Sequence, residues 1–177
     1  MKQILIVQAL EDERIELPVN DNIRFHHIFT HCGKANAAYS LTEWLLTHDK
    51  PDIVINVGTA GSCTLNIGDI AVCSSFIDRD LIPLKELGVD CVLTFDTKGK
   101  SICSTGDTFV TDKFTDADVC DMEAFALALT CKRQNLPFVA VKYVTDIVGQ
   151  NSVKAWEEKL ADARYNLTKY INSFILA

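Results

Sequence analysis

The chain has 177 residues, which is enough for one domain with a well-buried core and short for two. Its hydrophobic content of 48% and charged content of 23% are ordinary for a globular protein. The net charge is −7 and no stretch is basic, so we expect neither nucleic acid nor an anionic membrane surface as a partner. No apolar run approaches the roughly 20 residues that a membrane span requires. We therefore expect a single domain over residues 1–177.

The cysteines and the first residues indicate a cytoplasmic protein. The seven cysteines form an odd set without a C-x-x-C pair, and several lie inside apolar runs, where cysteine behaves as a small hydrophobic residue. Such a set fits a reducing compartment better than a disulfide framework. Residues 1–2 lead directly into a strand-like segment, without the pattern of a cleaved signal peptide.

The sequence carries no pattern that is typical of a metal or cofactor site. His26, His27 and His31 cluster, but they lack partner ligands at a recognisable metal spacing. The glycine-rich segment 58–61 lacks the G-x-G-x-x-G order of a dinucleotide-binding turn, and no P-loop or Cys/His nucleophile pattern occurs. We therefore expect no metal and no organic cofactor.

Strand-like and helix-like segments alternate along the chain. Runs rich in β-branched and aromatic residues predict strands at 2–9, 24–31, 53–57, 67–76, 101–104 and 138–144. An acidic turn or short helix is expected at 11–17, and apolar residues at helical spacing predict helices at 33–46, 122–133 and 153–175. The segment 78–100 mixes charges with proline and glycine and predicts no clear element. The alternation indicates an α/β sandwich.

Three of the predicted strands lead into polar residues. The apolar run 138–144 ends in Thr145-Asp146, the run 4–9 is followed by the acidic segment 11–13, and the run 53–57 is followed by the segment 58–62. Ligands of open α/β sheets bind beyond the carboxyl ends of the strands. These three strand ends therefore predict one shared pocket.

Seven short motifs are spread over nearly the whole chain. They are A-L-E-D-E (9–13), C-G-K-A-N-A-A (32–38), V-I-N-V-G-T-A-G (54–61), N-I-G-D-I (66–70), S-T-G-D-T-F-V (104–110), D-M-E-A (121–124) and V-T-D-I-V-G-Q-N-S (144–152). In this order they resemble the nucleoside phosphorylase/nucleosidase family, and most closely its methylthioadenosine/S-adenosylhomocysteine nucleosidase branch. The resemblance implies a compact three-layer α/β/α sandwich with a mixed central sheet, a homodimer, and hydrolysis of an adenine nucleoside to adenine and free sugar. Two segments, around 20–31 and 76–100, look shorter than in that family.

Three acids match functional positions of the family. By the resemblance, Asp146 is the general acid that protonates the departing purine, since an anionic purine is a poor leaving group. Glu13 matches the carboxylate that activates the attacking water, and Glu123 matches the one that binds the ribose hydroxyls. Taken alone, each acid could instead cap a turn or begin a helix. Glu11 and Asp12 adjoin Glu13, so an assignment shifted by one residue is also open.

Seven further residues match positions that line the nucleoside pocket of the family. Thr59 stands where the family usually has a serine, and Met122 matches the residue beneath the ribose. Phe109 and Val110 match the pocket for the purine base. Apolar contact with the 5′ substituent is expected from Leu10, Cys32 and Trp156. Phe109 and Trp156 could equally belong to the hydrophobic core.

Water is the expected nucleophile, rather than phosphate. Phosphorylases of this family bind phosphate with arginines, because a dianion needs charge-assisted donors. Here Asn56-Val57 and the acidic segment 11–13 take the places of two such arginines, and Arg14 is the only nearby cation that the sequence suggests. A phosphate-dependent purine nucleoside phosphorylase and a non-catalytic nucleoside-binding protein are the alternatives. Binding alone would not require all three acids.

Overall fold

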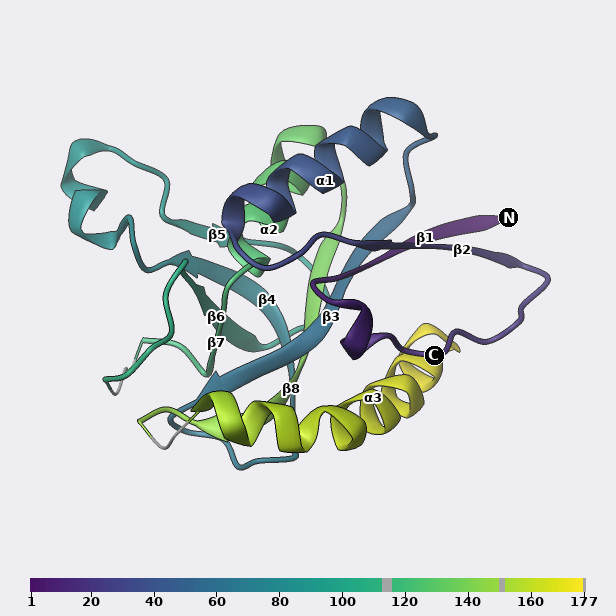
Figure 1. Ribbon diagram of the computed structural model, residues 1–177. Coiled ribbons are helices and arrows are strands. Elements are labelled where there is room, and N and C mark those ends of the chain that lie inside the picture. The colour runs from purple at the N-terminus through teal and green to yellow at the C-terminus, as the bar shows by residue number, and fades with distance from the viewer. Residues whose placement is uncertain (113–115, 150–151, 177) are drawn as a thin grey trace.

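Helices cover both faces of a mixed β-sheet. The computed structural model describes residues 1–112, 116–149 and 152–176, apart from the side chains of 152–155 and 176. Helices α1 (Lys34–Thr47) and α2 (Ala124–Gln134) lie on one face of the sheet, and α3 (Ser152–Leu176) lies on the other (Figure 1). Two short 3-10 helices are also present, η1 (Glu11–Glu13) and η2 (Ile82–Leu87). This arrangement confirms the predicted three-layer α/β/α fold.

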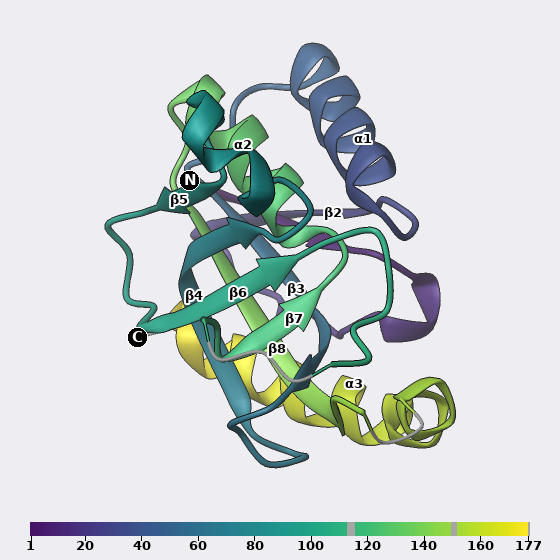
Figure 2. The ribbon, with the colours of Figure 1, turned by 90° about the vertical axis from the view of Figure 1, so that its left-hand side faces the viewer.

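The described strands form one sheet that curls on itself. They are β1 (Lys2–Gln8), β2 (Ile23–Phe29), β3 (Ile53–Ser62), β4 (Ile70–Asp78), β5 (Val92–Thr94), β6 (Ser101–Thr105), β7 (Val119–Asp121) and β8 (Phe138–Ile147). Strand β1 pairs in parallel with β2 and β3, β3 pairs in parallel with β8, and β8 pairs antiparallel with β4. Because β4 pairs with β6, β6 with β7 and β7 with β3, these strands close a ring (Figure 2).

Successive residues of the central strands contact opposite helical layers. In β1, Leu5 and Val7 are fully buried on the side of α1 and α2, whereas Ile4 and Ile6 pack with Leu167 of α3. A strand directs alternate side chains to opposite faces, so a strand covered on both faces needs an unbroken apolar run. None of the helices in the described parts of the chain is both long and apolar enough to cross a lipid bilayer.

Two central strands extend further than the sequence pattern predicts. The segment 58–62, which lies beyond the predicted strand 53–57, continues β3 and pairs with β8, with an irregularity in the register between Ala60 and Gly61. Strand β8 likewise runs to Ile147, so Asp146 lies within the strand rather than after it. Hydrogen bonds from the neighbouring strand therefore outweigh the low strand propensity of glycine and aspartate here.

Other differences concern short elements and boundaries. Helix α2 begins at Ala124, so Met122 and Glu123 precede the helix instead of forming its first turn. Strands β5 and β7 have three residues each and were not predicted, nor was η2. Three residues are too few to show a periodicity of two, so such strands are recognised only from their partners.

Candidate active site

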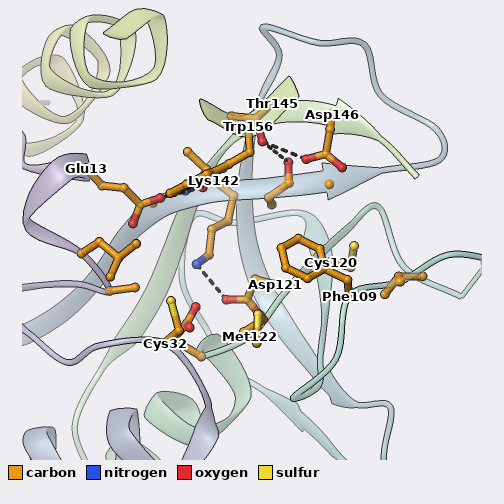
Figure 3. A pocket seen from close by; sticks show the side chains of 18 of the residues that line it. Glu13, Cys32, Phe109, Cys120, Asp121, Met122, Lys142, Thr145, Asp146 and Trp156 are labelled. Atoms are coloured by element: carbon orange, nitrogen blue, oxygen red, sulfur yellow. Dashed lines mark hydrogen bonds and ion pairs between the residues drawn. The ribbon is translucent and has the colours of Figure 1, made fainter. Parts of the chain in front are cut away.

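A cavity of about 390 Å³ lies beyond β1 and β7, along β3 and β8 (Figure 3). Its volume falls in the usual range for sites that bind small molecules. The structure brings all ten predicted site residues to the lining of this one cavity, although they come from distant parts of the sequence. They are Leu10, Glu13, Cys32, Thr59, Phe109, Val110, Met122, Glu123, Asp146 and Trp156.

Glu13 is the member of the acidic segment that faces the cavity. Its exposed fraction is 5%, whereas Glu11 and Asp12 are exposed to solvent, so the geometry favours Glu13 over its neighbours. Thr59 donates two hydrogen bonds to Glu13 Oε1, from its backbone N at 3.0 Å and from its hydroxyl at 2.6 Å. The indole Nε1 of Trp156 donates to the same hydroxyl at 2.9 Å, which links α3 to this carboxylate.

A buried glutamine fixes the backbone that carries Glu13. Gln8 Nε2 donates to the Glu13 carbonyl at 2.6 Å, and Gln8 Oε1 accepts from Ile15 N at 3.0 Å. His27 Nε2 lies 2.9 Å from the same Gln8 oxygen, which can only accept, so this ring nitrogen carries the hydrogen. Burial, reinforced by the charge of Arg14, lowers the pKa of His27 to about 4. His27 is therefore neutral at physiological pH.

Glu123 lies just before α2 and is 7% exposed. Gly33 N donates to Glu123 Oε1 at 2.9 Å. Burial is the main reason that the pKa of Glu123 is raised to about 7, and the negative charge of Asp121 adds to it. Placing Glu123 between β7 and α2 thus yields a carboxyl group whose charge depends on pH near neutrality.

Asp146 lies on β8 against a glycine of β3. Thr145 Oγ1 donates to Asp146 Oδ1 at 2.9 Å. A Cβ atom at Gly61 would lie only 3.0 Å from Asp146 Oδ2 and 3.2 Å from Cys120 Sγ. A side chain at position 61 would therefore press on the carboxylate and on the thiol, and glycine leaves room for both. Figure 3 shows Asp146 and Glu13 at separate sides of the cavity.

The three acids share one pattern of hydrogen bonds. In each, a protein group donates to one carboxylate oxygen: Glu13 Oε1, Glu123 Oε1 and Asp146 Oδ1. The second oxygen of each has no hydrogen-bond partner among the residues that the structure describes. One oxygen thus fixes the side chain, and the other is left to interact with a ligand in the cavity.

A buried ion pair lies between these acids. Lys142 Nζ lies 2.8 Å from Asp121 Oδ2, and the two side chains are 2% and 1% exposed (Figure 3). Burial alone would lower the pKa of Lys142, but the Asp121 carboxylate outweighs it and raises that pKa. Asp121 also accepts hydrogen bonds from Thr105 Oγ1 at 2.6 Å and from Ala124 N at 2.9 Å. Both partners of the pair are therefore charged.

A family model described as the phosphorylase superfamily matches residues 22–99 and 104–176. The chain belongs to this superfamily. It is also 31% identical over 179 aligned residues to the 5′-methylthioadenosine/S-adenosylhomocysteine nucleosidase of Bacillus velezensis, with 81% of this chain and 77% of the relative covered.

Solved structures of similar fold include two from Helicobacter pylori. One is a variant of a 5′-methylthioadenosine/S-adenosylhomocysteine nucleosidase (MTAN) with 5′-methylthioadenosine in its active site. It has 16% identity and a TM-score of 0.86, and the match covers 99% of this chain and 98% of that one. The other is a futalosine hydrolase, at 16% identity and a TM-score of 0.84, covering 98% of this chain and 97% of that one. At such low identity these two similarities concern the fold alone.

The cations around the cavity differ from those that the sequence suggested for this superfamily member. Arg14 does not line the cavity: it pairs with the exposed Glu11 at 3.1 Å and lies over the ring of Phe29. Lys142 and Arg79 line the cavity instead, so the expectation that Arg14 is the only nearby cation is wrong. A lysine inside the apolar run 138–144 was a signal for Lys142, since a lysine is rarely buried without a partner.

Two aromatic residues lie at the edge of the cavity rather than deep in the core. Phe109 is 60% exposed, which contradicts the alternative that it fills the hydrophobic core. Trp156 is partly exposed and has its indole nitrogen bound to Thr59. Within 1–112, 116–149 and 152–176, no group of three or more His, Cys, Asp or Glu side chains is arranged to hold a metal ion.

Proposed function

We propose that this cavity binds an adenine nucleoside of the 5′-methylthioadenosine or S-adenosylhomocysteine type, and that the protein hydrolyses its N-glycosidic bond. The observation that carries the proposal is the arrangement of Glu13, Glu123 and Asp146 around one cavity, each with one oxygen held by the protein. The name of the Bacillus velezensis relative supports this substrate class.

The proposed reaction divides the work between two sides of the cavity. On the purine side, formed by Phe109, Val110 and Asp146, the acid donates a proton to N7 while the C1′–N9 bond breaks and its electrons stay with adenine. On the sugar side, formed by Glu13, Thr59, Met122 and Glu123, Glu13 takes a proton from water, whose oxygen bonds to C1′. Adenine and free sugar are the products, and one water is consumed.

Glu123 and the apolar residues hold the substrate in this scheme. An ionised Glu123 accepts hydrogen bonds from the 2′ and 3′ hydroxyls, and these bonds strengthen as positive charge develops on the sugar. Met122 lies beneath the ribose, and Leu10, Cys32 and Trp156 surround the 5′ substituent. Phe109 stacks on the base, and backbone groups near Val110 contact its edge.

The state of the cations supports water, rather than phosphate, as the nucleophile. The charge of Lys142 is compensated by the Asp121 carboxylate at 2.8 Å, and the Nη atoms of Arg79 donate to backbone carbonyls. A phosphate dianion needs charge-assisted donors, and the donors of both cations are already bound to protein groups. Glu13 and Glu123 would in addition repel a dianion.

The proposal is tested by incubating the purified protein with 5′-methylthioadenosine in ¹⁸O-labelled water, with and without phosphate. We expect adenine to be released at the same rate in both, and the label to appear in the free sugar. Release that requires phosphate would make the protein a phosphorylase. Tight binding without release would make it a non-catalytic nucleoside-binding protein.

We further propose that the protein is a cytoplasmic homodimer, as the family resemblance implies. The set of cysteines supports a reducing compartment. Sedimentation of the full chain at the mass of two copies is the expected result, and sedimentation as a monomer would contradict it.

A further inference from the structure

Arg79 follows β4 directly, and its guanidinium binds backbone carbonyls. Nη1 donates to Ser104 O and to Asp121 O, each at 3.0 Å. Nη2 donates to Gly106 O at 3.1 Å and to Thr108 O at a short distance. One side chain thus binds four carbonyl groups: those of Ser104 and Asp121, near the ends of β6 and β7, and those of Gly106 and Thr108, in the segment that follows β6.

Three of these carbonyls belong to the segment that leads to the purine side of the cavity. Residues 104–108 run from the end of β6 to Phe109 and Val110, and beyond Thr105 they form no helix or strand. The contact is tight, because a Cβ atom at Gly106 would lie 2.6 Å from Arg79 Nε. The loop backbone therefore rests directly on the guanidinium.

The residues next to Arg79 hold the same loop from its exposed side. Asp80 Oδ2 accepts from Asp107 N at 3.0 Å, and Asp107 Oδ1 accepts from Lys34 N at 2.8 Å. Lys34 Nζ in turn lies 2.8 Å from Asp80 Oδ2. The segment 78–80 thus connects β4, the start of α1 and the loop 106–110.

We propose that Arg79 is a positioning residue that sets the loop 106–110 and thereby the affinity for the purine base. This inference rests on the proposed function, because it assumes that adenine lies against Phe109 and Val110. The sugar side keeps its own support, since the Asp121 carboxylate is held by Lys142, Thr105 and Ala124 N independently of Arg79. Loss of Arg79 should therefore weaken the binding of the base and spare that of the sugar.

The test uses the two reaction products as separate probes of the two sides. Inhibition constants for adenine and for 5-methylthioribose, together with kcat and KM for 5′-methylthioadenosine, are measured for the unmodified protein, Arg79→Gln and Arg79→Lys. We expect Arg79→Gln to raise the inhibition constant of adenine about tenfold, which is the effect of losing one hydrogen bond that involves a charged group. The inhibition constant of 5-methylthioribose should stay unchanged. In Arg79→Gln, KM should rise by a larger factor than kcat falls. The constants of Arg79→Lys should lie between those of the unmodified protein and Arg79→Gln. Arg164→Gln, a substitution at an exposed position of α3, is the matched control and should change neither inhibition constant.

The outcomes separate this inference from the proposed function. If Arg79→Gln weakens the binding of both products equally, Arg79 has a general structural role and the inference is overturned. Unchanged adenine binding in Arg79→Gln would also overturn it. If Arg79→Gln does not fold, Arg79→Lys, which keeps the charge and three donors, decides by the same comparison. If the unmodified protein releases no adenine, the proposed function fails, and adenine binding measured directly still tests Arg79.

Discussion

The sugar side and the purine side of the cavity are held in different ways. On the sugar side, Glu13 and Glu123 are 5% and 7% exposed, and donors from several packed elements fix them. On the purine side, Phe109 is 60% exposed and lies in a loop that rests on one guanidinium. Asp146 faces the purine side but belongs to β8. The proposed reacting groups therefore lie on or beside the sheet, and the residues that would recognise the base lie on a loop.

This difference predicts where substitutions should act. Changes among the buried groups of the sugar side should alter stability or turnover, because rigid partners surround them. Changes in the loop that carries Phe109 should alter affinity for the base instead.

The largest effect on stability is expected from Lys142→Met. The substitution leaves Asp121 buried without its cation, and breaking such a pair costs about 3–5 kcal/mol of the free energy of unfolding. Urea unfolding measures this loss. Lys159→Met, which breaks an exposed pair with Asp162, is the control and should change stability little. Equal stability of Lys142→Met and the unmodified protein would show that the buried pair is not needed.

A smaller effect is expected from the titration of Glu123. Its pKa is raised from 4.5 to about 7, mainly by burial, so the charged form is lost as the pH falls below about 7. In the proposed reaction only this form accepts hydrogen bonds from both ribose hydroxyls. The value of kcat/KM, which reports on the free enzyme, should decline in that range. Glu123→Gln should have a low kcat/KM at every pH and should lack this decline. If kcat/KM of Glu123→Gln declines in the same range, the titration belongs to another group.

The same shift has a consequence for stability, with a defined sign. Between pH 4.5 and about 7 the folded protein keeps a proton on Glu123 that the unfolded chain has released. The free energy of unfolding should therefore fall as the pH rises through this window, and Glu123→Gln should remove that contribution. Urea unfolding at both ends of the window measures the difference.

The smallest effect is expected from Trp156→Phe. Phenylalanine keeps the apolar contact but cannot donate to Thr59 Oγ1, so the hydroxyl that holds Glu13 loses one partner. One neutral hydrogen bond corresponds to a drop in kcat of about 2–10-fold. Thr59→Val removes both the acceptor of the Trp156 indole and the hydroxyl that donates to Glu13, so it should lower kcat further. If Trp156→Phe keeps full turnover, the link between α3 and Glu13 has no role in catalysis.

The sequence predicted the fold and the lining of the cavity better than the support around it. Glu13, Glu123 and Asp146 lie in short motifs that are visible locally, so they could be predicted to share one pocket, although Asp146 lies within β8 and Glu123 precedes α2 rather than beginning it. Gln8, Arg79 and Asp121 were missed as supporting groups, since their importance comes from partners far away in the chain. Asp121, for example, pairs with Lys142, which lies beyond α2 in the middle of β8.

The alternatives left open by the pattern were decided by burial. The choice among the three residues of the acidic segment 11–13 could not be made from spacing, yet only Glu13 is buried. The sequence was equally consistent with Phe109 as a core residue, because the local sequence does not show whether another segment covers an aromatic side chain. That depends on the tertiary structure, in which Phe109 is 60% exposed.

The division of labour between Asp146 and Glu13 is tested most directly with two substrates that differ in their leaving group. Turnover of 5′-methylthioadenosine is compared with that of 4-nitrophenyl riboside, whose phenolate departs without a proton, in Asp146→Asn and Glu13→Gln. We expect Asp146→Asn to slow adenine release by about 10²–10⁴ and to spare the nitrophenyl substrate, whereas Glu13→Gln should slow both. Near-normal adenine release by Asp146→Asn, or equal loss on both substrates in that variant, would contradict the role of Asp146 as the acid.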